Sequence, residues 1–278
     1  MTFVLREAAY GKSEIRLVKV VRDEARHELS DVTVDVTLQG DFKTAYKSGD
    51  NSTLLATDTM RNTVYALAAE HDVRKLETFG RALVERFVAV GPTVERARVQ
   101  LVEHPWERLG DHDHAFRRAG GGDRVAVVSG DGHHARFEAG IEGLELLRTT
   151  GSGWENFLRE EYTTLPETDD RILATAVSAR WSYAEGGFDY AAAWRAAREA
   201  LLVSFADHYS PSVQFTLQRM GEAILRAVEA IERVQLALPN RHHLLFDLER
   251  FGQRNDNRIF HATTEPYGLI EGTVERAR

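Results

Sequence analysis

Hydrophobic and polar residues follow two different periods along the chain, and the changes of period divide it into strands and helices. Alternating apolar and polar residues indicate half-buried strands, whereas apolar spacings of three and four indicate helices. In the first half, the patterns predict strands over 12–42, 96–109 and 114–130 and helices over 61–71 and 76–90. The order is therefore strand pair, helix pair, strand pair, and the first pair is long and antiparallel.

The second half repeats this order of elements, although the two halves share no convincing repeat of residues. A repeated set of elements indicates two similar modules, which we place at residues 1–136 and 137–278. The predicted fold class is α+β, with each module an antiparallel sheet that has its helices on one face. The predicted segments of the second half are strands over 135–151 and 170–185, helices over 189–209 and 211–232, and strands over 234–251 and 258–276.

The period changes within LLATDTMRNTVYALA, residues 54–68, and three oxygen-bearing side chains stand at the change: Thr57, Asp58 and Thr59. Such side chains cap helices by accepting backbone amide protons of the first turn. We expect Asp58 or Thr59 to start the helix, which leaves Thr57 at the end of the preceding segment. Capping explains one of these three side chains, and the other two are candidates for a role in catalysis or binding.

Composition places the chain among ordinary globular proteins. Hydrophobic residues make up 43% and charged residues 28%, with only 6 prolines, which excludes disordered and fibrous classes. The net charge of -8 and the pI near 5.8 argue against a nucleic-acid partner, which needs a concentrated basic patch. No run approaches the roughly 20 apolar residues of a membrane span. Arg6 and Glu7 fall where a signal peptide would have its apolar core, so we expect neither secretion nor membrane insertion.

The chain has no cysteine, which excludes disulfides, thiolate zinc sites and a thiol nucleophile. His112 and His114 are the best metal candidates, because alternate residues of a strand share one face. The sequence nearby offers no third metal ligand. A polar strand end or a hydrogen-bonded pair therefore also explains these two histidines. His133 and His134 are weaker candidates, since adjacent strand residues point to opposite faces. We predict no metal site.

Lysine is rare in the chain, with 5 Lys against 30 Arg, and Lys12 stands just before the first long strand. A lysine acts as a base only where burial or nearby positive charge lowers its pKa, and otherwise it is a solvated surface residue. Asn240 and His242 stand two residues apart around a predicted turn in LPNRHHLLFDL. Both can face one pocket, and a structural hydrogen-bonded pair explains them equally well.

The segment SPSVQ opens a predicted helix, with Ser210 as its N-cap and Pro211 as its first residue. The amide of Val213 is then among the unpaired donors of the first turn, and Gln214 stands beside it. A backbone donor next to a carboxamide can bind the edge of a planar heterocycle, whereas a glutamine in a first turn is otherwise solvated. Arg171 follows two acidic residues, and from the residues alone we expect it to form a salt bridge.

Six segments of the chain, in this order and spacing, closely resemble motifs of the urate oxidase (uricase) family of bacterial type. The resemblance spans about residues 9–274, which is nearly the whole chain. It implies two tandem T-fold modules per chain, which fits the doubled order of elements, and a homotetramer with active sites at subunit interfaces. The segments are YGKSEIRLVKV, ATDTMRNTVYA, FLREEYTTLPETDDRILATAVSARW, SPSVQ, LPNRHHLLFDL and PYGLIEGTV.

The resemblance also implies an activity in purine degradation: oxidation of urate by O2 and water to 5-hydroxyisourate and H2O2, with no metal or organic cofactor. Lys12 and Thr57 match the family's proton-relay dyad, and His242 matches the histidine that extends it. By removing protons from urate, such a relay raises the energy of the electrons of urate, so that urate can reduce O2 directly. Thr57 and Asp58 are expected to come from a neighbouring subunit, so that the hydroxyl of Thr57 meets the lysine of another subunit.

Other positions match residues that hold the substrate. The resemblance makes Arg171 a clamp on a carbonyl and a ring nitrogen of urate. Gln214 and the amide of Val213 match groups on the opposite edge of the ring, and Asn240 matches an asparagine above it. The implied catalytic residues are Lys12, Thr57 and His242, and the implied substrate-binding residues are Thr57, Asp58, Trp154, Arg171, Val213, Gln214 and Asn240.

Trp154 departs from the family pattern, which has a phenylalanine stacked on urate at this position. An indole offers a larger face to a flat purine, but a slip of one residue in the register would place Glu155 there instead. The chain ends in VERAR, without the Ser-Lys-Leu type of address found on peroxisomal members. A cytoplasmic enzyme of bacterial type fits these features.

Two other functions fit the same fold class. Another T-fold enzyme, acting on a pterin or a related purine, would carry a cysteine or histidine cluster and a substrate-binding glutamate, which cannot be assembled from this sequence. A non-catalytic, purine-binding T-fold protein would not need Lys12. The set of Lys12, Thr57 and His242 therefore favours a cofactor-independent urate oxidase with urate and O2 as its substrates.

Overall fold

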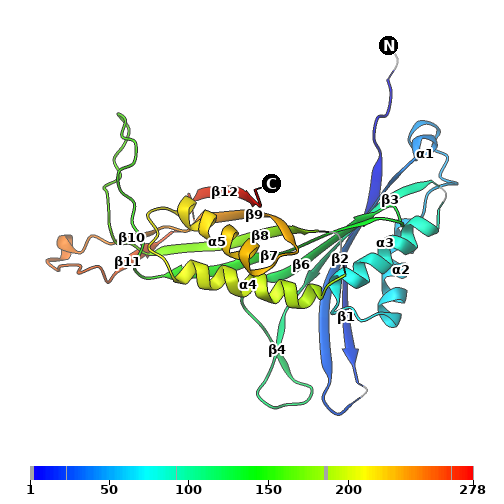
Figure 1. The fold of residues 1–278 in the computed structure, drawn as a ribbon, viewed down its shortest axis with the longest axis horizontal. Helices are drawn as coiled ribbons and strands as arrows, with labels where there is room; N and C mark the ends of the chain where they lie inside the picture. The colour runs from blue at the N-terminus through cyan, green and yellow to red at the C-terminus, as the bar shows by residue number, and fades with distance from the viewer. Residues whose placement is uncertain (1–2, 23, 92, 185–186, 264, 278) are drawn as a thin grey trace. The chain divides into compact units, whose positions relative to one another are not determined.

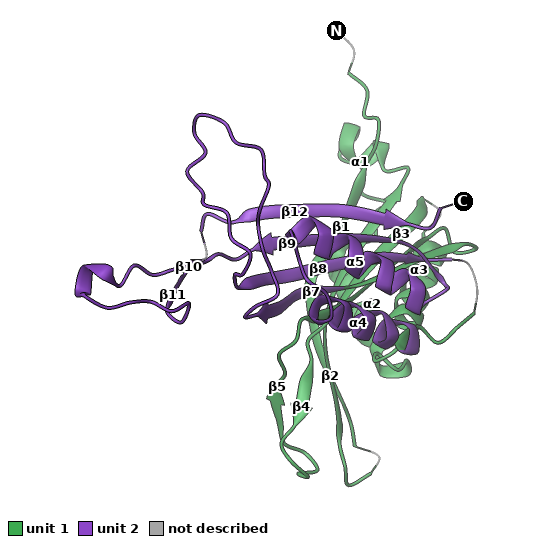
Figure 2. Cartoon of the chain, turned by 60° about the vertical axis from the view of Figure 1, so that its left-hand side comes forward, with its two compact units in different colours: residues 1–140, 185–191 green, residues 141–184, 192–278 purple. Residues whose placement is uncertain are grey.

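The computed structural model describes residues 3–22, 24–91, 93–184, 187–263 and 265–277. The chain forms two compact units, which Figure 2 shows in different colours. Unit 1 comprises Met1–Gly140 and Glu185–Ala191, and unit 2 comprises Ile141–Ala184 and Ala192–Arg278.

Unit 1 is an antiparallel sheet with two long helices packed against it (Figure 1). Its strands lie in the order β1-β2-β3-β6-β7, and β7 continues into unit 2. Strands β4 and β5 form a separate short hairpin. The elements are β1 (Ala9–Val21), β2 (Glu28–Gly40), α1 (Lys43–Ser48), α2 (Thr57–Glu70), α3 (Leu76–Ala89), β3 (Val94–Glu103), β4 (Trp106–Arg108), β5 (Phe116–Arg118), β6 (Asp123–Gly130) and β7 (Ala135–Arg148).

Alternation along β2 explains why the helices cover one face of this sheet. Val32, Val34 and Val36 are almost completely buried and belong to the same apolar core as the inner side chains of α2 and α3. Helix α3 lies so close to the sheet that a Cβ at Gly80 would come within 2.8 Å of the Val128 side chain. The helices are therefore held against the sheet by tight apolar packing.

Unit 2 repeats the architecture with its own sheet and helices. Its strands lie in the order β7-β8-β9-β12, and β10 and β11 form a separate short hairpin. Helix α5 packs on β12, where a Cβ at Gly221 would lie 2.5 Å from the Val274 side chain. The elements after β7 are β8 (Leu173–Tyr183), α4 (Tyr190–Ala206, which starts in unit 1), α5 (Val213–Ala227), β9 (Ile231–Asn240), β10 (His243–Leu245), the short 3-10 helix η1 (Glu249–Phe251), β11 (Phe260–Ala262) and β12 (Gly268–Glu275).

The predicted order of strands and helices is confirmed in both halves, but two predicted helix starts are wrong. Helix α2 begins at Thr57 after Ala56, which has no capping side chain, so neither Asp58 nor Thr59 starts it. Helix α5 begins at Val213, and its cap is Ser212, not Ser210. Helix α2 starts where Tyr10 holds the amide of Leu55, and helix α5 starts where Ser212 caps it.

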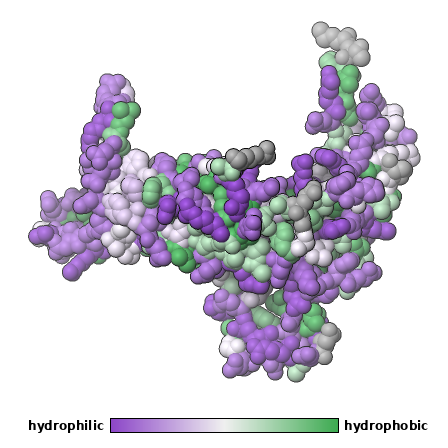
Figure 3. Space-filling view, in the orientation of Figure 1, coloured by the Kyte–Doolittle hydropathy of each residue, from purple (hydrophilic) through white to green (hydrophobic). Residues whose placement is uncertain are grey.

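The surface seen in Figure 3 is mostly hydrophilic, with smaller hydrophobic areas among the polar residues. In the described part of the chain, no helix combines the length and the apolar character that crossing a membrane requires.

Candidate active site

A cavity of about 790 Å³ lies in unit 2. Trp154, Arg171, Asn240 and His242 line it, so the structure brings these predicted site residues together. The rest of the wall combines apolar side chains with polar ones, among them the carboxylates of Glu167, Asp170 and Glu265. Trp154 lines the cavity, whereas Glu155 is exposed and lies outside the wall.

Backbone hydrogen bonds join the segment 151–154 to the residues that precede α5. Gly153 N donates to Ser210 O (2.8 Å), and Ser210 N donates to Gly151 O (2.9 Å). Ser152 and Ser210 are fully buried where these segments meet. The start of α5 is therefore fixed next to the segment that carries Trp154.

The segment 151–154 is also hydrogen-bonded to the segment that carries Arg171. Trp154 and Thr168 exchange two backbone hydrogen bonds, at 2.7 and 3.1 Å, and Arg171 N donates to Ser152 O (2.8 Å). Three stretches far apart in the sequence thus form one backbone junction beside the cavity. This junction explains how Trp154 and Arg171 come to share a wall.

Arg171 is a half-buried cation without a salt bridge to any described residue, so the simple expectation of a salt bridge to its acidic neighbours is wrong. Asp170 instead accepts a hydrogen bond from Thr150 Oγ1 (2.8 Å). Burial lowers the pKa of the Arg171 guanidinium from its usual value, and its Nε is buried with no hydrogen-bond partner among the described residues. The guanidinium carbon lies 5.8 Å from the centre of the Trp154 ring. Such a group needs an acceptor, and the cavity can supply one in a ligand.

The ring of Trp154 has an aromatic neighbour. It stacks on Phe157 with the two ring centres 5.6 Å apart and an angle of 12° between the planes. A flat aromatic wall beside a cationic fork is suited to a flat ligand with electron-rich oxygen atoms.

Helix α5 begins with unpaired amide groups, as the sequence predicts, although its cap differs. The Ser212 side chain accepts from Phe215 N (3.1 Å), and this leaves the amides of Val213 and Gln214 without partners among the described residues. Val213 is buried at 2% exposure, whereas the Gln214 side chain is exposed. Neither residue lines the cavity itself, but the backbone junction through Ser210 places both next to it.

Asn240 and His242 flank the end of β9, and both face the cavity. Between them, Arg241 is turned elsewhere: its backbone N donates to Ala174 O (2.9 Å), and its guanidinium pairs with Glu145. The side chains of Asn240 and His242 make no hydrogen bond to another described residue, so the interpretation as a structural pair is wrong.

The three remaining predicted residues, Lys12, Thr57 and Asp58, lie in unit 1. Thr57 and Asp58 open α2, and both are exposed. Asp58 pairs with Arg61 (2.6 Å) and accepts from Asn62 Nδ2 (3.0 Å). The hydroxyl of Thr57 and the amine of Lys12 have no partner among the residues that the structure describes.

Helix α2 lies along β1, and contacts fix it at its start, middle and end. They have the same order along both elements, so the start of α2, with Thr57, lies alongside the part of β1 that carries Lys12. The contacts are Leu55 N to Tyr10 Oη (2.8 Å), Tyr65 Oη to Arg16 O (2.9 Å), and Lys19 Nζ to Ala68 O (2.7 Å) and His71 O (2.8 Å).

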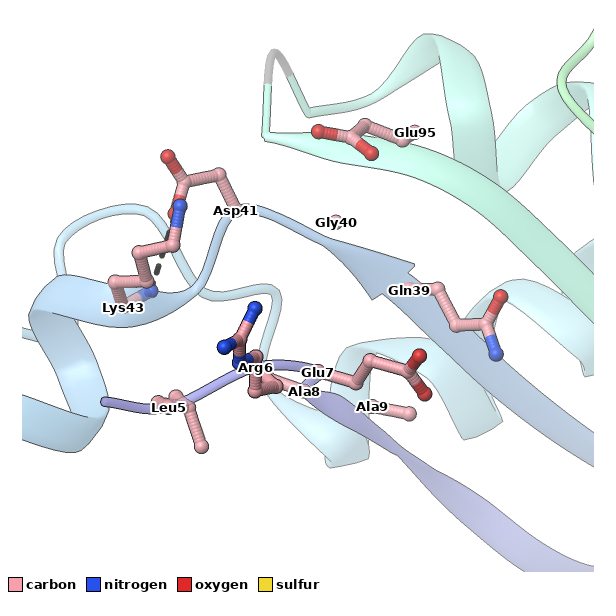
Figure 4. A pocket seen from close by; sticks show the side chains of 10 residues that line it. All are labelled: Leu5, Arg6, Glu7, Ala8, Ala9, Gln39, Gly40, Asp41, Lys43 and Glu95. Atoms are coloured by element: carbon pink, nitrogen blue, oxygen red, sulfur yellow. Dashed lines mark hydrogen bonds and ion pairs between the residues drawn. The ribbon is translucent and has the colours of Figure 1, made fainter. Parts of the chain in front are cut away.

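A second cavity, of about 590 Å³, lies in unit 1 near the N-terminal segment (Figure 4). Its charged side chains have mixed signs, and Lys43 is already paired with Asp41 at 3.5 Å. None of the predicted site residues lines it. Its lining, among the described residues, has no aromatic ring, so it lacks the combination of ring and cation found in unit 2.

His112 and His114 lie in the turn between β4 and β5, so their predicted place in a strand is wrong. Among the residues with described positions, no three or more His, Cys, Asp or Glu side chains form a group that could hold a metal ion.

Comparison with known proteins assigns the chain to a family. The family model described as Uricase matches residues 8–129 and 137–271. A uricase from Arthrobacter globiformis is 45% identical over 273 residues, which cover 98% of this chain and 90% of the relative. The chain belongs to the uricase family. It is therefore an oxidoreductase of the urate oxidase type, as the resemblance of its motifs predicts.

Other members of the uricase family agree with this assignment. A uricase from Aspergillus flavus is 37% identical over 295 residues, covering 98% of this chain and 97% of the relative. The crystal structure of the uricase from Arthrobacter globiformis superposes with a TM-score of 0.96 at 44% identity, covering 99% of this chain and 96% of that one. A uricase structure from Bacillus fastidious, at 22% identity and a TM-score of 0.84, shares the fold. The predicted α+β fold class is confirmed.

The sequence patterns did not predict two contacts of this uricase family member. Tyr10 fixes the start of α2 through Leu55, and Ser210 ties the start of α5 to the Trp154 segment. Tyr10 stands two residues before Lys12, so strand alternation alone could have placed the two on one face. The role of Ser210 had no local signal, because its partners stand far away in the sequence.

Proposed function

We propose that the chain oxidises urate with O2 and water to 5-hydroxyisourate and H2O2, without a metal or organic cofactor. One observation carries the proposal within the uricase family: the unpaired guanidinium of Arg171 and the ring of Trp154 stand side by side at one cavity. Urate is flat, carries negative charge and is rimmed by oxygen and nitrogen atoms. It needs an aromatic face and a cationic fork, and this cavity has both.

The substrate is held from several sides in this proposal. Arg171 binds a carbonyl oxygen and a ring nitrogen with two N–H groups, while Trp154 covers one face of the ring. The amide of Val213 and the carboxamide of Gln214 bind the opposite edge, and Asn240 stands over the ring where O2 or water waits. The unpaired amides at the start of α5 support these roles.

Proton removal drives the chemistry. Lys12, with Thr57 and His242, takes protons from urate, which raises the energy of its electrons. Two electrons then pass from the deprotonated ring to O2, which takes up two protons to become H2O2. Water adds to the oxidised ring and gives 5-hydroxyisourate, so that atoms and electrons balance.

We also propose that the active site forms between copies of the chain in a homotetramer, with Thr57 and Asp58 supplied by a neighbouring copy. The two T-fold modules, 1–136 and 137–278, would then each contribute part of a site. The motifs predict that Thr57 of one copy meets the lysine of another. The contacts between β1 and α2 within unit 1 support a pair from one chain, and we adopt that arrangement. A cytoplasmic location stays a prediction.

A direct assay tests the activity. Protein purified through a chelator should consume urate, followed by its ultraviolet absorbance, together with O2, and should release H2O2 in equal amount. Addition of metal salts should change the rate little. Absence of urate loss, or strict dependence on an added metal, would contradict the proposal.

The base role of Lys12 has its own test. Lys12→Ala should lower kcat about 100-fold or more, while the Kd of a non-reactive urate analogue stays within about threefold, because the base acts in the chemical step. Lys43→Ala, which removes a surface lysine paired with Asp41, serves as the matched control. Equal losses of kcat and analogue binding in Lys12→Ala would argue against the base role.

A further inference from the structure

Strand β1 contains a β-bulge directly after Lys12. Lys12 pairs with Val36 and Ile15 pairs with Val34, so that Ser13 and Glu14 together stand opposite Asp35 alone. One extra residue of this kind breaks the alternation of a strand and redirects the side chains on one side of it.

The bulge decides on which face of the sheet Lys12 lies. Directly opposed residues of an antiparallel pair point to the same face. Val34 and Val36 are both buried in the core beneath the helices, so Ile15 and Lys12 share that face. Without the extra residue, strict alternation would place Lys12 and Ile15 on opposite faces.

Tyr10 shows independently where this part of β1 points. It pairs with Leu38, which is fully buried on the helix side, and its hydroxyl reaches Leu55 N just before α2. Lys12, two residues further along the same strand, points to the same side. The bulge thus directs Lys12 toward the start of α2, where Thr57 stands.

The backbone conformation of Glu14 in this bulge is unfavourable, and a hydrogen bond stabilises it. Glu14 has φ of 58°, in the left-handed region that glycine and asparagine adopt far more readily. Its amide has left the β1–β2 ladder, and a lost backbone hydrogen bond is costly. Asp35 Oδ1 accepts that amide at 2.7 Å, which is a short, charge-assisted hydrogen bond.

We propose that Asp35 is a positioning residue for Lys12: its carboxylate holds the bulge that directs the lysine to the helix side of the sheet. The inference rests on the proposed role of Lys12 in proton transfer. Asp35 acts through the backbone of Glu14, so it affects the direction of the amine and leaves the substrate cavity of unit 2 unchanged.

A pair of substitutions at Asp35 separates its hydrogen bond from its charge. Asp35→Asn keeps an oxygen acceptor, and kcat should stay within about threefold of the unchanged protein. Asp35→Leu removes the acceptor, and kcat should fall about tenfold or more, since small misplacements of a catalytic group are costly. KM should change by less than about threefold, which is the effect of losing one weak hydrogen bond. Circular dichroism and the thermal midpoint identify any variant that fails to fold.

A control and a double variant exclude a merely structural effect. Asp131→Ala removes a carboxylate that accepts the amides of His133 (3.0 Å) and His134 (2.8 Å) in another part of unit 1, and kcat should not change. In a Lys12→Ala background, Asp35→Leu should lower kcat no further, because the group it positions is gone.

The possible failures are distinguishable. If Lys12→Ala loses turnover while Asp35→Leu keeps it, the positioning role of Asp35 is wrong and the proposed function stands. If Asp35→Leu and Asp131→Ala lose kcat equally, or if the losses of Asp35→Leu and Lys12→Ala add, the role is also wrong. If Lys12→Ala keeps full turnover, the proposed relay fails, and this inference fails with it.

Discussion

Helices α2 and α5 both begin at residues proposed to contact urate, but only α5 begins with a side-chain cap. Ser212 accepts the amide of Phe215 at the start of α5, whereas Ala56 precedes α2 and has no group that can accept an amide. Thr57 and Asp58 then follow inside the helix, where their oxygen atoms do not cap it. The sequence around α2 is thus rich in capping groups that do not cap.

Different forces therefore fix the two helix starts. Helix α5 starts where its own sequence caps it, and its first amides stay unpaired beside the cavity. Helix α2 starts where β1 holds it, through Tyr10 Oη at Leu55 and Lys19 Nζ at the other end. The Thr57 hydroxyl consequently has no structural role at the helix start. This is consistent with its proposed role in proton transfer.

The largest effect expected from this difference concerns Thr57. Thr57→Ala should lower kcat about 100-fold, because a relay member is lost. The thermal midpoint and the oligomeric state should hardly change, since the hydroxyl has no partner among the described residues. Steady-state kinetics, calorimetry and light scattering measure the three quantities.

Thr59→Ala is the matched control for Thr57→Ala, because it removes the same hydroxyl from the same exposed first turn. It should leave kcat within about twofold, as surface substitutions without contacts do little. If Thr57→Ala destabilises the fold as much as it slows turnover, the two helix starts do not differ in the way described.

A smaller effect is expected from Tyr10→Phe, which leaves the amide of Leu55 without its acceptor. Stability should fall by about 1 kcal/mol, and kcat should fall about tenfold as the start of α2 shifts. Tyr65→Phe removes the hydrogen bond from Tyr65 Oη to Arg16 O in the middle of the same helix and should change kcat far less. Equal kinetic losses in both variants would mean that Tyr10 does not fix the start of α2 specifically.

Hydrophobic periodicity predicted the elements because burial decides them and burial leaves a pattern. Val32, Val34 and Val36 alternate with polar residues and form the inner face of β2, as expected. Helix starts were less predictable, because several residues of SPSVQ can cap. Ser210 is instead buried against Ser152 and exchanges backbone hydrogen bonds with Gly151 and Gly153, distant contacts that no local pattern reveals.

The candidate site shows the same limit. The motifs predicted that Trp154, Arg171, Asn240 and His242 belong together, and the structure places all four at one cavity. Alternation places Lys12 on the face of Tyr10, but it could not predict that Lys12 shares the face of Ile15, because that depends on a bulge. That bulge is held by a side chain on a different strand.

The next smaller effect concerns the capped helix. Ser212→Ala should lower stability by about 1 kcal/mol, because the amide of Phe215 loses its acceptor. KM for urate should rise more than kcat falls, since the first turn of α5 holds the substrate and does no chemistry. Ser212→Asn keeps a good cap and should restore both quantities. A loss of kcat at unchanged KM would contradict the substrate-holding role of α5.

The smallest effect comes from giving α2 the cap that it lacks. Ala56 already has cap-like backbone angles, φ of -59° and ψ of 138°, so Ala56→Ser can accept an amide of the first turn without rearrangement. Stability should rise by about 0.5–1 kcal/mol. KM should rise about threefold, because Asp58, which is proposed to bind urate, stands in this first turn and the new cap occupies one amide of the turn. A gain in thermal midpoint with unchanged KM would show that the missing cap has no functional reason, and the contrast between α2 and α5 would then be structural alone.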